Sequence, residues 1–177
     1  MSKNILLPTL LCLIGFVRAS FAQQTADWQS YSKDGYSIQY PNDWGLEDSI
    51  TMGTDFFLFS TNNDPKDDFR ENINLVSQNV AQFGVDLDDY VQLNFGQIRQ
   101  MATNFKVERM DKEKDGKNGE HYILVYTMDQ GIFHLKLMQY YWIVNGQAYV
   151  LTLTCEQDAF DSYEKVGKEI MASFEVK

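Results

Sequence analysis

The chain has 177 residues, of which 44% are hydrophobic and 14% are aromatic, and its formal net charge at pH 7 is −10. Such a negative chain is repelled by phosphate backbones and anionic lipids, which disfavours nucleic acid and membrane-surface partners. Cationic and apolar partners remain open.

Residues 1–22 have the pattern of a secretory signal peptide. Lys3 supplies a basic start, residues 5–17 form an apolar stretch too short to span a membrane, and Ala22 precedes the expected cleavage site. The mature chain is then residues 23–177, a length suited to a single domain. Residues 1–22 carry two basic and no acidic residues, so their removal changes the net charge to −12. We therefore expect an exported protein, periplasmic or secreted, with no transmembrane segment after cleavage.

Short strand patterns separated by turn signals occupy the N-terminal part of the mature chain. Residues 28–40 predict a hairpin that turns at Asp34-Gly35. Tyr36, Ile38 and Tyr40 alternate with polar residues, which predicts a half-buried second strand. Three further segments follow: a short apolar strand at 55–60, a polar acidic loop at 61–68 and a strand at 71–80.

Residues 86–102 predict the first helix. Asp86 is a suitable N-cap, and Asp88 and Asp89 lie in the first turn, where the helix dipole favours negative charge. Gly96 weakens this helix by about 1 kcal/mol relative to Ala, so we expect packing to hold it.

The C-terminal part predicts four strands and a second helix. The strands are expected at 105–113, 120–129, 132–144 and 147–156. Asn145-Gly146 is a strong hairpin signal, because both central residues of such a turn need a positive φ. Gln130-Gly131 predicts the preceding turn. The last helix begins at Asp158 or Ala159, and its apolar stripe carries Phe160, Tyr163, Val166, Ile170 and Phe174.

Two-residue loops at 130–131 and 145–146 determine which side chains of the last three strands share a face. One face then carries His121, Ile123, Val125, Met138, Tyr140, Trp142, Tyr149, Leu151 and Leu153. The opposite face carries Leu124, Tyr126, Phe133, Leu135, Leu137, Ile143 and Val150. Both faces are apolar, whereas a sheet with one wet face alternates between apolar and polar residues. We therefore expect an α+β fold in which one antiparallel sheet is sandwiched between helices on both faces, an α/β/α sandwich.

Two segments of the chain resemble the PsbP-like family. Residues 34–44, Asp-Gly-Tyr-Ser-Ile-Gln-Tyr-Pro-Asn-Asp-Trp, resemble its opening strand, and residues 141–155 with the ending Ser173-Phe174 resemble its closing hairpin and helix. The similarity extends over residues 28–176. It implies an antiparallel sheet flanked by helices on both sides. Members include the extrinsic photosystem II subunit PsbP, linked to calcium and manganese retention, and DcrB-type envelope proteins, so the resemblance also implies a binding or assembly role without catalysis.

Two acidic segments are candidate sites for weak calcium binding, because hard cations prefer carboxylate oxygens. One loop holds four carboxylates, at Asp64, Asp67, Asp68 and Glu71. Asp111, Glu113 and Asp115 copy the first half of an EF-hand loop, but Tyr122 stands where a bidentate Glu is needed. The alternatives are a solvated charge run and an ordinary hairpin turn.

The mature chain keeps a single cysteine, Cys155, which excludes an intramolecular disulfide. In the expected register Cys155 stands opposite Lys136, with His134 diagonal to it on the same face. Nearby cations favour the thiolate, so these three residues form a candidate reactive-thiol site. The alternative is an inert buried cysteine. His121 is interpreted as a structural, hydrogen-bonded histidine.

Aromatic residues form a further candidate site, a ligand or peptide groove at Tyr36, Tyr40, Trp44, Tyr140 and Trp142. The alternative is ordinary core packing, to which aromatic side chains contribute strongly.

Enzyme motifs are missing from the sequence, which has no H-E-x-x-H, G-x-S-x-G, P-loop, C-x-x-C or dinucleotide fingerprint. We therefore expect no catalytic residues and no cofactor. The sequence favours a non-catalytic module that binds another envelope or secreted protein. The alternatives are a carrier of a small molecule or of a divalent metal such as calcium or manganese, and a hydrolase of unknown type.

Overall fold

The computed structural model describes residues 28–33, 35–49, 53–61 and 68–177. The first strands are β1 (Trp28–Lys33), β2 (Tyr36–Pro41), β3 (Gly45–Glu47), β4 (Phe56–Phe59) and β5 (Asn72–Asn79). A short 3₁₀ helix, η1 (Ala81–Phe83), leads to α1 (Leu87–Met101). The remaining elements are β6 (Thr103–Lys114), β7 (Glu120–Gln130), β8 (Phe133–Val144), β9 (Gln147–Glu156), α2 (Phe160–Ser173) and β10 (Glu175–Val176). The expected signal peptide lies outside the described residues.

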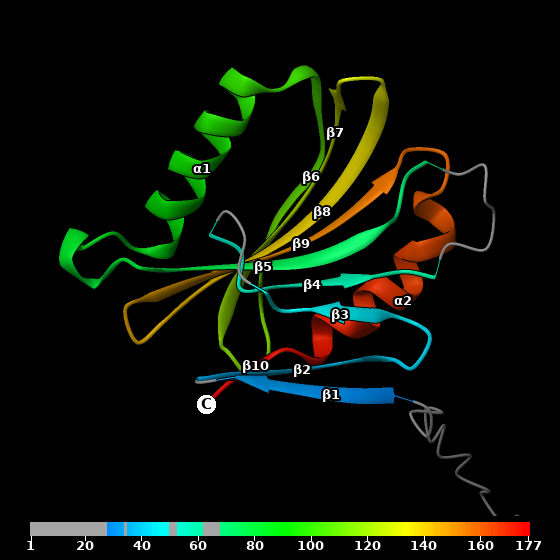
Figure 1. Ribbon diagram of the computed structural model, residues 1–177. Coiled ribbons are helices and arrows are strands. Elements are labelled where there is room, and N and C mark those ends of the chain that lie inside the picture. The colour runs from blue at the N-terminus through cyan, green and yellow to red at the C-terminus, as the bar shows by residue number, and fades with distance from the viewer. Residues whose placement is uncertain (1–27, 34, 50–52, 62–67) are drawn as a thin grey trace, which may run out of the picture.

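The strands form two antiparallel sheets instead of the single sheet expected from the sequence. The larger sheet has seven strands in the order β3-β4-β5-β9-β8-β7-β6, and the smaller has three in the order β1-β2-β10 (Figure 1). The second sheet was not expected from the sequence because β10 is only two residues long and has no detectable period. The fold class is confirmed at the level of an α+β fold with mostly antiparallel sheets and two α-helices.

The register of the last three strands follows their turns. Asn145 and Gly146 have φ of 52° and 76°, and Trp142 pairs with Tyr149, which confirms the predicted β8–β9 hairpin. The β7–β8 turn was predicted one residue too early: Gly131, with φ of 63°, is its first central residue. The physical reason is that a turn led by Gly places its positive φ at the first central position.

This error moves each β7–β8 pairing by two residues and therefore leaves the faces unchanged, because side chains alternate along a strand with a period of two. Along β8, Met138, Tyr140 and Trp142 belong to one hydrophobic cluster, here the first cluster. Leu137 and Tyr141, which alternate with them, belong to the second cluster. The prediction that both faces of the sheet are apolar is confirmed.

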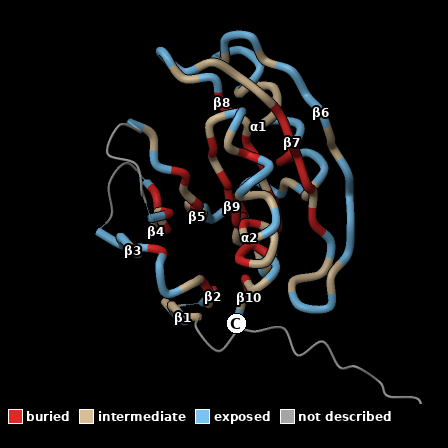
Figure 2. Tube along the Cα trace, turned by 90° about the vertical axis from the view of Figure 1, so that its right-hand side faces the viewer, coloured by how far each residue is buried: buried red, intermediate tan, exposed pale blue. Residues whose placement is uncertain are grey.

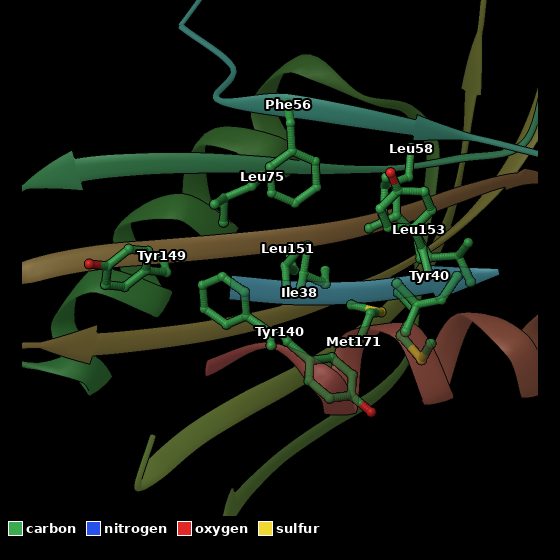
Figure 3. Packing of buried hydrophobic residues seen from close by; sticks show 14 of the residues in the cluster. Ile38, Tyr40, Phe56, Leu58, Leu75, Tyr140, Tyr149, Leu151, Leu153 and Met171 are labelled. Carbon is green, nitrogen blue, oxygen red and sulfur yellow. The ribbon is translucent and has the colours of Figure 1, made fainter. Parts of the chain in front are cut away.

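The first cluster is larger because three parts of the fold contribute to it. Ile38 comes from β2, Leu151 from β9 and Met171 from α2, and all three are fully buried (Figure 3). In the second cluster Tyr90 and Val91 of α1 pack with side chains of β7, β8 and β9. The buried stretches concentrate on these central strands (Figure 2).

The two α-helices begin differently. The carboxylate of Asp86 caps α1 by accepting a hydrogen bond from the Asp89 backbone N–H at 2.9 Å, as predicted. At the start of α2, Ala159 provides no side-chain cap. Packing holds this helix instead, through buried Phe160, Ile170 and, just after its end, Phe174. Within the described ranges, neither helix has the length and apolar character needed to cross a membrane.

Candidate functional site

The five aromatic side chains proposed for a groove all lie in the first cluster. Tyr36, Tyr40, Trp44, Tyr140 and Trp142 are each at most 9% exposed. Tyr140 and Trp142 are neighbours on one face of β8, with ring centroids 5.7 Å apart. The burial of these five side chains agrees with the alternative of core packing. A groove formed by all five rings stays a prediction.

The three residues proposed for a reactive thiol do not come together as expected. Cys155 is opposite Lys136, as predicted, but the Lys136 ammonium lies over the Phe160 ring and binds Glu108 at 2.9 Å. His134 is directed to Asp129, with a side chain that is 75% exposed. Burial, followed by the charge of Glu71, raises the pKa of the Cys155 thiol. This is the opposite of the shift that a nucleophilic thiolate needs, which agrees with the alternative of an inert buried cysteine, and a reactive thiol stays a prediction.

The acidic loop proposed for a metal lies partly outside the described residues, which exclude Asp64 and Asp67. Asp68 is exposed, and Glu71 is buried next to the start of β5. Within the part of the chain that the structure describes, no group of three His, Cys, Asp or Glu side chains could hold a metal ion. A metal site in this loop stays a prediction.

The EF-hand-like segment forms the β6–β7 turn. Arg109 pairs with Asp111 and Glu113. One carboxylate oxygen of Asp115 accepts backbone N–H bonds from residues 117, 118 and 119 at 2.6–3.1 Å. Burial opposes ionisation of Asp115, but these donors outweigh it and lower its pKa. Asp115 therefore serves the turn, while Asp111 and Glu113 lie in β6 and pair with Arg109, which agrees with the alternative of an ordinary hairpin.

His121 is a structural residue in the sense expected from the sequence. Its ring is stacked with those of Tyr140 and Trp142, at centroid distances of 5.6 and 5.5 Å. Its Nδ1 atom lies 3.5 Å from the Gly119 carbonyl oxygen and 3.6 Å from Asp115 Oδ2. The ring is thereby positioned by the β6–β7 turn and the first cluster.

A groove of about 580 Å³ lies between the C-terminal half of α1 and the strands β7 and β8; we call it the α1 groove. Its apolar lining comes from Ile98, Met101, Tyr126, Met128 and Leu137. Met101 is 86% exposed although it continues the apolar spacing of the helix. Just beyond the groove, Ile132 at the tip of the β7–β8 hairpin is 84% exposed. Large apolar side chains exposed next to a groove are typical of a contact surface.

Asp129 places a negative charge among the groove-lining residues. Its Oδ1 atom is 2.6 Å from Nδ1 of His134, and its other oxygen accepts a hydrogen bond from Asn104. The bond to His134 lowers the pKa of Asp129, and the same bond raises the pKa of His134. The groove thus combines an apolar lining with one carboxylate that is held ionised at neutral pH.

Sequence reasoning did not identify the α1 groove. Ile98 and Met101 follow the helical spacing, but spacing alone does not show that the helix covers the sheet incompletely at this end. The signal in the sequence was the position of two large apolar residues, Met101 at the end of a helix and Ile132 beside a turn glycine. Both are exposed in the structure.

Comparisons with solved structures find the same fold in bacterial proteins at low sequence identity. The cyanobacterial PsbP protein CyanoP of Synechocystis sp. PCC 6803 has a TM-score of 0.65 at 19% identity, covering 86% of this chain and 94% of CyanoP. LpqN of Mycobacterium tuberculosis, described as involved in cell envelope biogenesis, has a TM-score of 0.60 at 15% identity, covering 85% of this chain and 91% of LpqN. PA94 of Pseudomonas aeruginosa has a TM-score of 0.58 at 15% identity, covering 81% of this chain and 93% of PA94.

Comparison with curated proteins gives no match. The PsbP family model matches residues 26–176, which is most of the chain and includes every described strand and helix. With this match, the chain belongs to the PsbP family.

Proposed function

We propose that this chain is an exported, non-catalytic PsbP-like module that binds another protein of the cell envelope through the α1 groove. The observation that carries the proposal is the apolar lining of the groove. Met101, which is part of this lining, is 86% exposed. Membership of the PsbP family and the envelope role stated for LpqN support it. The signal-peptide pattern of residues 1–22 supports a periplasmic or secreted location.

The layering of the fold supports this use of α1. Residues of α2 pack in the first cluster and residues of α1 in the second, which supports a helix–sheet–helix sandwich (Figure 1). The second cluster receives only Tyr90 and Val91 as buried residues of α1. The C-terminal half of that helix is therefore available to cover a partner as well as its own sheet.

The groove favours a partner segment that carries apolar side chains and a basic residue. Apolar side chains would be buried against Ile98, Met101 and Met128, where about 25 cal/mol is gained for each Å² removed from water. A basic residue would face Asp129, and the net charge of −10 favours its approach.

The placement of the reactive residue types supports a role without catalysis. Burial holds Cys155 protonated, and the His121 ring is stacked against the rings of Tyr140 and Trp142. His134 and Asp129 form a pair, but among the described residues none of the hydrogen bonds to this pair comes from a hydroxyl or thiol group. A nucleophile adjacent to its base, which covalent catalysis requires, is not part of this arrangement.

The test is capture of partners from an envelope fraction by the mature chain, with Met101→Lys and Leu93→Lys variants compared with the wild type. Leu93 is also exposed on α1 but does not line the groove, so its variant controls for the added charge. We expect Met101→Lys to lose the partner and Leu93→Lys to retain it. Equal capture by both variants, or no specific partner for the wild type, would contradict the proposal.

A further inference from the structure

A second cavity, of about 320 Å³, opens where the two sheets meet, away from the α1 groove; we call it the Asp55 cavity. It is lined by Lys33, Tyr36, Asp55, Ser77, Gln147 and Tyr149. These residues come from the β1–β2 hairpin, the residue before β4, and the adjacent strands β5 and β9, where Ser77 pairs with Tyr149. The lining is therefore assembled from four separate parts of the chain.

In this cavity Oδ2 of Asp55 is buried without a hydrogen-bond partner in the described part of the chain, and the buried hydroxyl of Tyr36 interacts there with the Tyr31 hydroxyl, toward which it donates, so its oxygen accepts no bond. Tyr36 is only 3% exposed, so water does not compensate freely for the missing bond. A buried polar group without a partner costs about 1–3 kcal/mol, and more when it is charged. A carboxylate oxygen without a partner, beside a phenol oxygen that can still accept, points to a ligand that donates hydrogen bonds.

The charge at the cavity is negative where these atoms lie. Burial raises the pKa of Tyr31, Tyr36 and Tyr149, and the carboxylate of Asp55 raises each of them further. All three phenols are therefore protonated and neutral at pH 7, next to an acidic side chain. Asp48, which accepts a hydrogen bond from the Tyr31 hydroxyl at 3.2 Å, adds a second negative charge nearby.

Aromatic rings surround the same position. The rings of Tyr36 and Tyr149 meet edge to face with centroids 6.4 Å apart, and Phe56 lies 6.0 Å from Tyr36. Tyr31 contacts Phe56 edge to face at 5.6 Å. In Figure 3 the hydroxyl end of Tyr149 points away from Leu151 and Met171, so its ring borders the core on one side only. Aromatic rings beside a carboxylate are the surroundings that favour an organic cation.

Lys33 is the one basic side chain among the residues that line the cavity. It has no ion pair with Asp55 among the described contacts, which pair other residues. A ligand cation would therefore meet a carboxylate that is not neutralised by a salt bridge to Lys33. The ammonium of Lys33, which lines the cavity, is nevertheless a competitor for that position.

We propose that the Asp55 cavity binds the primary ammonium group of a small amine, with Asp55 Oδ2 and the Tyr36 hydroxyl as hydrogen-bond acceptors. A primary ammonium has three N–H donors, enough for both buried oxygens, and an alkyl chain beyond it contacts the surrounding rings. A quaternary ammonium has no donor and would leave both oxygens unsatisfied. A cavity of about 320 Å³ accommodates an amine of a few carbon atoms.

The experiment is isothermal titration of the mature protein at pH 7 with n-butylamine, with n-butanol and tetramethylammonium as matched probes. We expect saturable binding of butylamine and at least tenfold weaker binding of the other two. Binding of butanol as tight as that of butylamine would overturn the proposal, because a neutral hydroxyl would then serve equally well. The absence of saturable binding by wild-type protein would overturn it as well.

Variants locate the binding. Asp55→Asn keeps the side-chain shape and removes the charge, and we expect it to weaken butylamine binding about tenfold or more, because a charge-assisted hydrogen bond is lost. Asp68→Asn removes the same charge from an exposed position and controls for the net charge of the chain. Equal loss of affinity in the two variants would show a general electrostatic effect and overturn the site.

Tyr36→Phe separates binding from folding. Its removed hydroxyl interacts with the Tyr31 hydroxyl, which keeps its own bond to Asp48, so we expect a melting temperature close to that of the wild type together with weaker butylamine binding. Unchanged affinity in this variant would remove Tyr36 from the site and overturn the proposed pair of acceptors.

Lys33→Met tests the competitor. We expect it to bind butylamine at least as tightly as the wild type. Binding that appears only after this substitution would show that Lys33 itself occupies the cavity and would overturn the proposal. The Met101→Lys variant should bind butylamine like the wild type, so failure at the α1 groove and failure at the Asp55 cavity are distinguishable.

Discussion

The two hydrophobic clusters of the large sheet are closed to different degrees by helices of similar length. α2 has 14 residues and buries Phe160, Gly167, Ile170 and Met171, whereas α1 has 15 residues and buries only Tyr90 and Val91. The first cluster also receives side chains from β2, so it is covered by a helix and a second sheet together. One face of the sheet therefore holds the fold together, while the other leaves apolar side chains such as Met101 exposed.

The largest expected difference is in the cost of removing one apolar side chain from each side. Leu151→Ala removes a fully buried side chain from the first cluster and should lower the free energy of unfolding by about 2–5 kcal/mol. Met101→Ala, at the α1 groove, should change it by about 0.5 kcal/mol or less, because that side chain is already exposed. Urea denaturation of both variants measures the difference, and equal costs would show that the two sides are equally closed.

Replacing one glycine in each helix by alanine should change stability in opposite directions. A Cβ atom at Gly167 would lie 2.7 Å from Cδ2 of buried Leu153, so Gly167→Ala should destabilise the protein by about 1–3 kcal/mol. A Cβ atom at Gly96 meets nothing within 4 Å, so Gly96→Ala should stabilise it by about 0.5–1 kcal/mol. Thermal unfolding of the two variants is the measurement, and a shift of the same sign in both would contradict the contrast between the helices.

Much of the fold could be predicted from the sequence because turn chemistry and strand period agree. The Asn145-Gly146 turn determined the β8–β9 register, since both residues have the positive φ that the turn requires. The Gly131 turn was placed one residue too early. The side chains were still assigned to the correct faces of the sheet, because the pairing moved by an even number of residues. The second sheet was not predictable in this way, because β10 is formed by a pairing between distant residues and not by a local pattern.

Less of the candidate sites could be predicted. The alternation of Tyr36, Ile38 and Tyr40 correctly placed these residues inside, but no local signal shows that the Tyr36 hydroxyl borders a cavity. Asp55 stands directly before the apolar strand β4, and this isolated carboxylate was the one available sign of the Asp55 cavity. The α1 groove depends on how far a helix lies from its sheet, which is a tertiary property.

Amide hydrogen exchange should reveal the same contrast in local stability. We expect the amides in the C-terminal half of α1 to exchange faster than those in the C-terminal half of α2, because few of the α1 side chains there are buried. Mass spectrometry of peptides from each helix measures the rates. Equal protection of the two segments would mean that α1 is held as firmly as α2.

The smallest expected effect concerns His134 and Asp129 beside the α1 groove. Their hydrogen bond raises the pKa of His134 above its ordinary value of about 6.5. Protonated His134 therefore favours the folded state below that value, and the contribution is lost as the pH rises through the raised pKa. Asp129→Asn should return the pKa of His134 toward its ordinary value in an NMR titration, and an unchanged pKa would exclude Asp129 as the cause.

The C-terminal strand β10 pairs with β2, so that Val176 lies opposite Tyr36, and the backbone N–H of Lys177 donates to the Gly35 carbonyl at 2.9 Å. Asn118 of the β6–β7 turn also contacts this segment: its side-chain amide donates to the Phe174 carbonyl and accepts from the Val176 backbone N–H. Tyr36 is synthesised long before Val176, so the small sheet stays incomplete until β10 has been made. Its closure joins distant parts of the chain and should therefore be a late and slow step of folding.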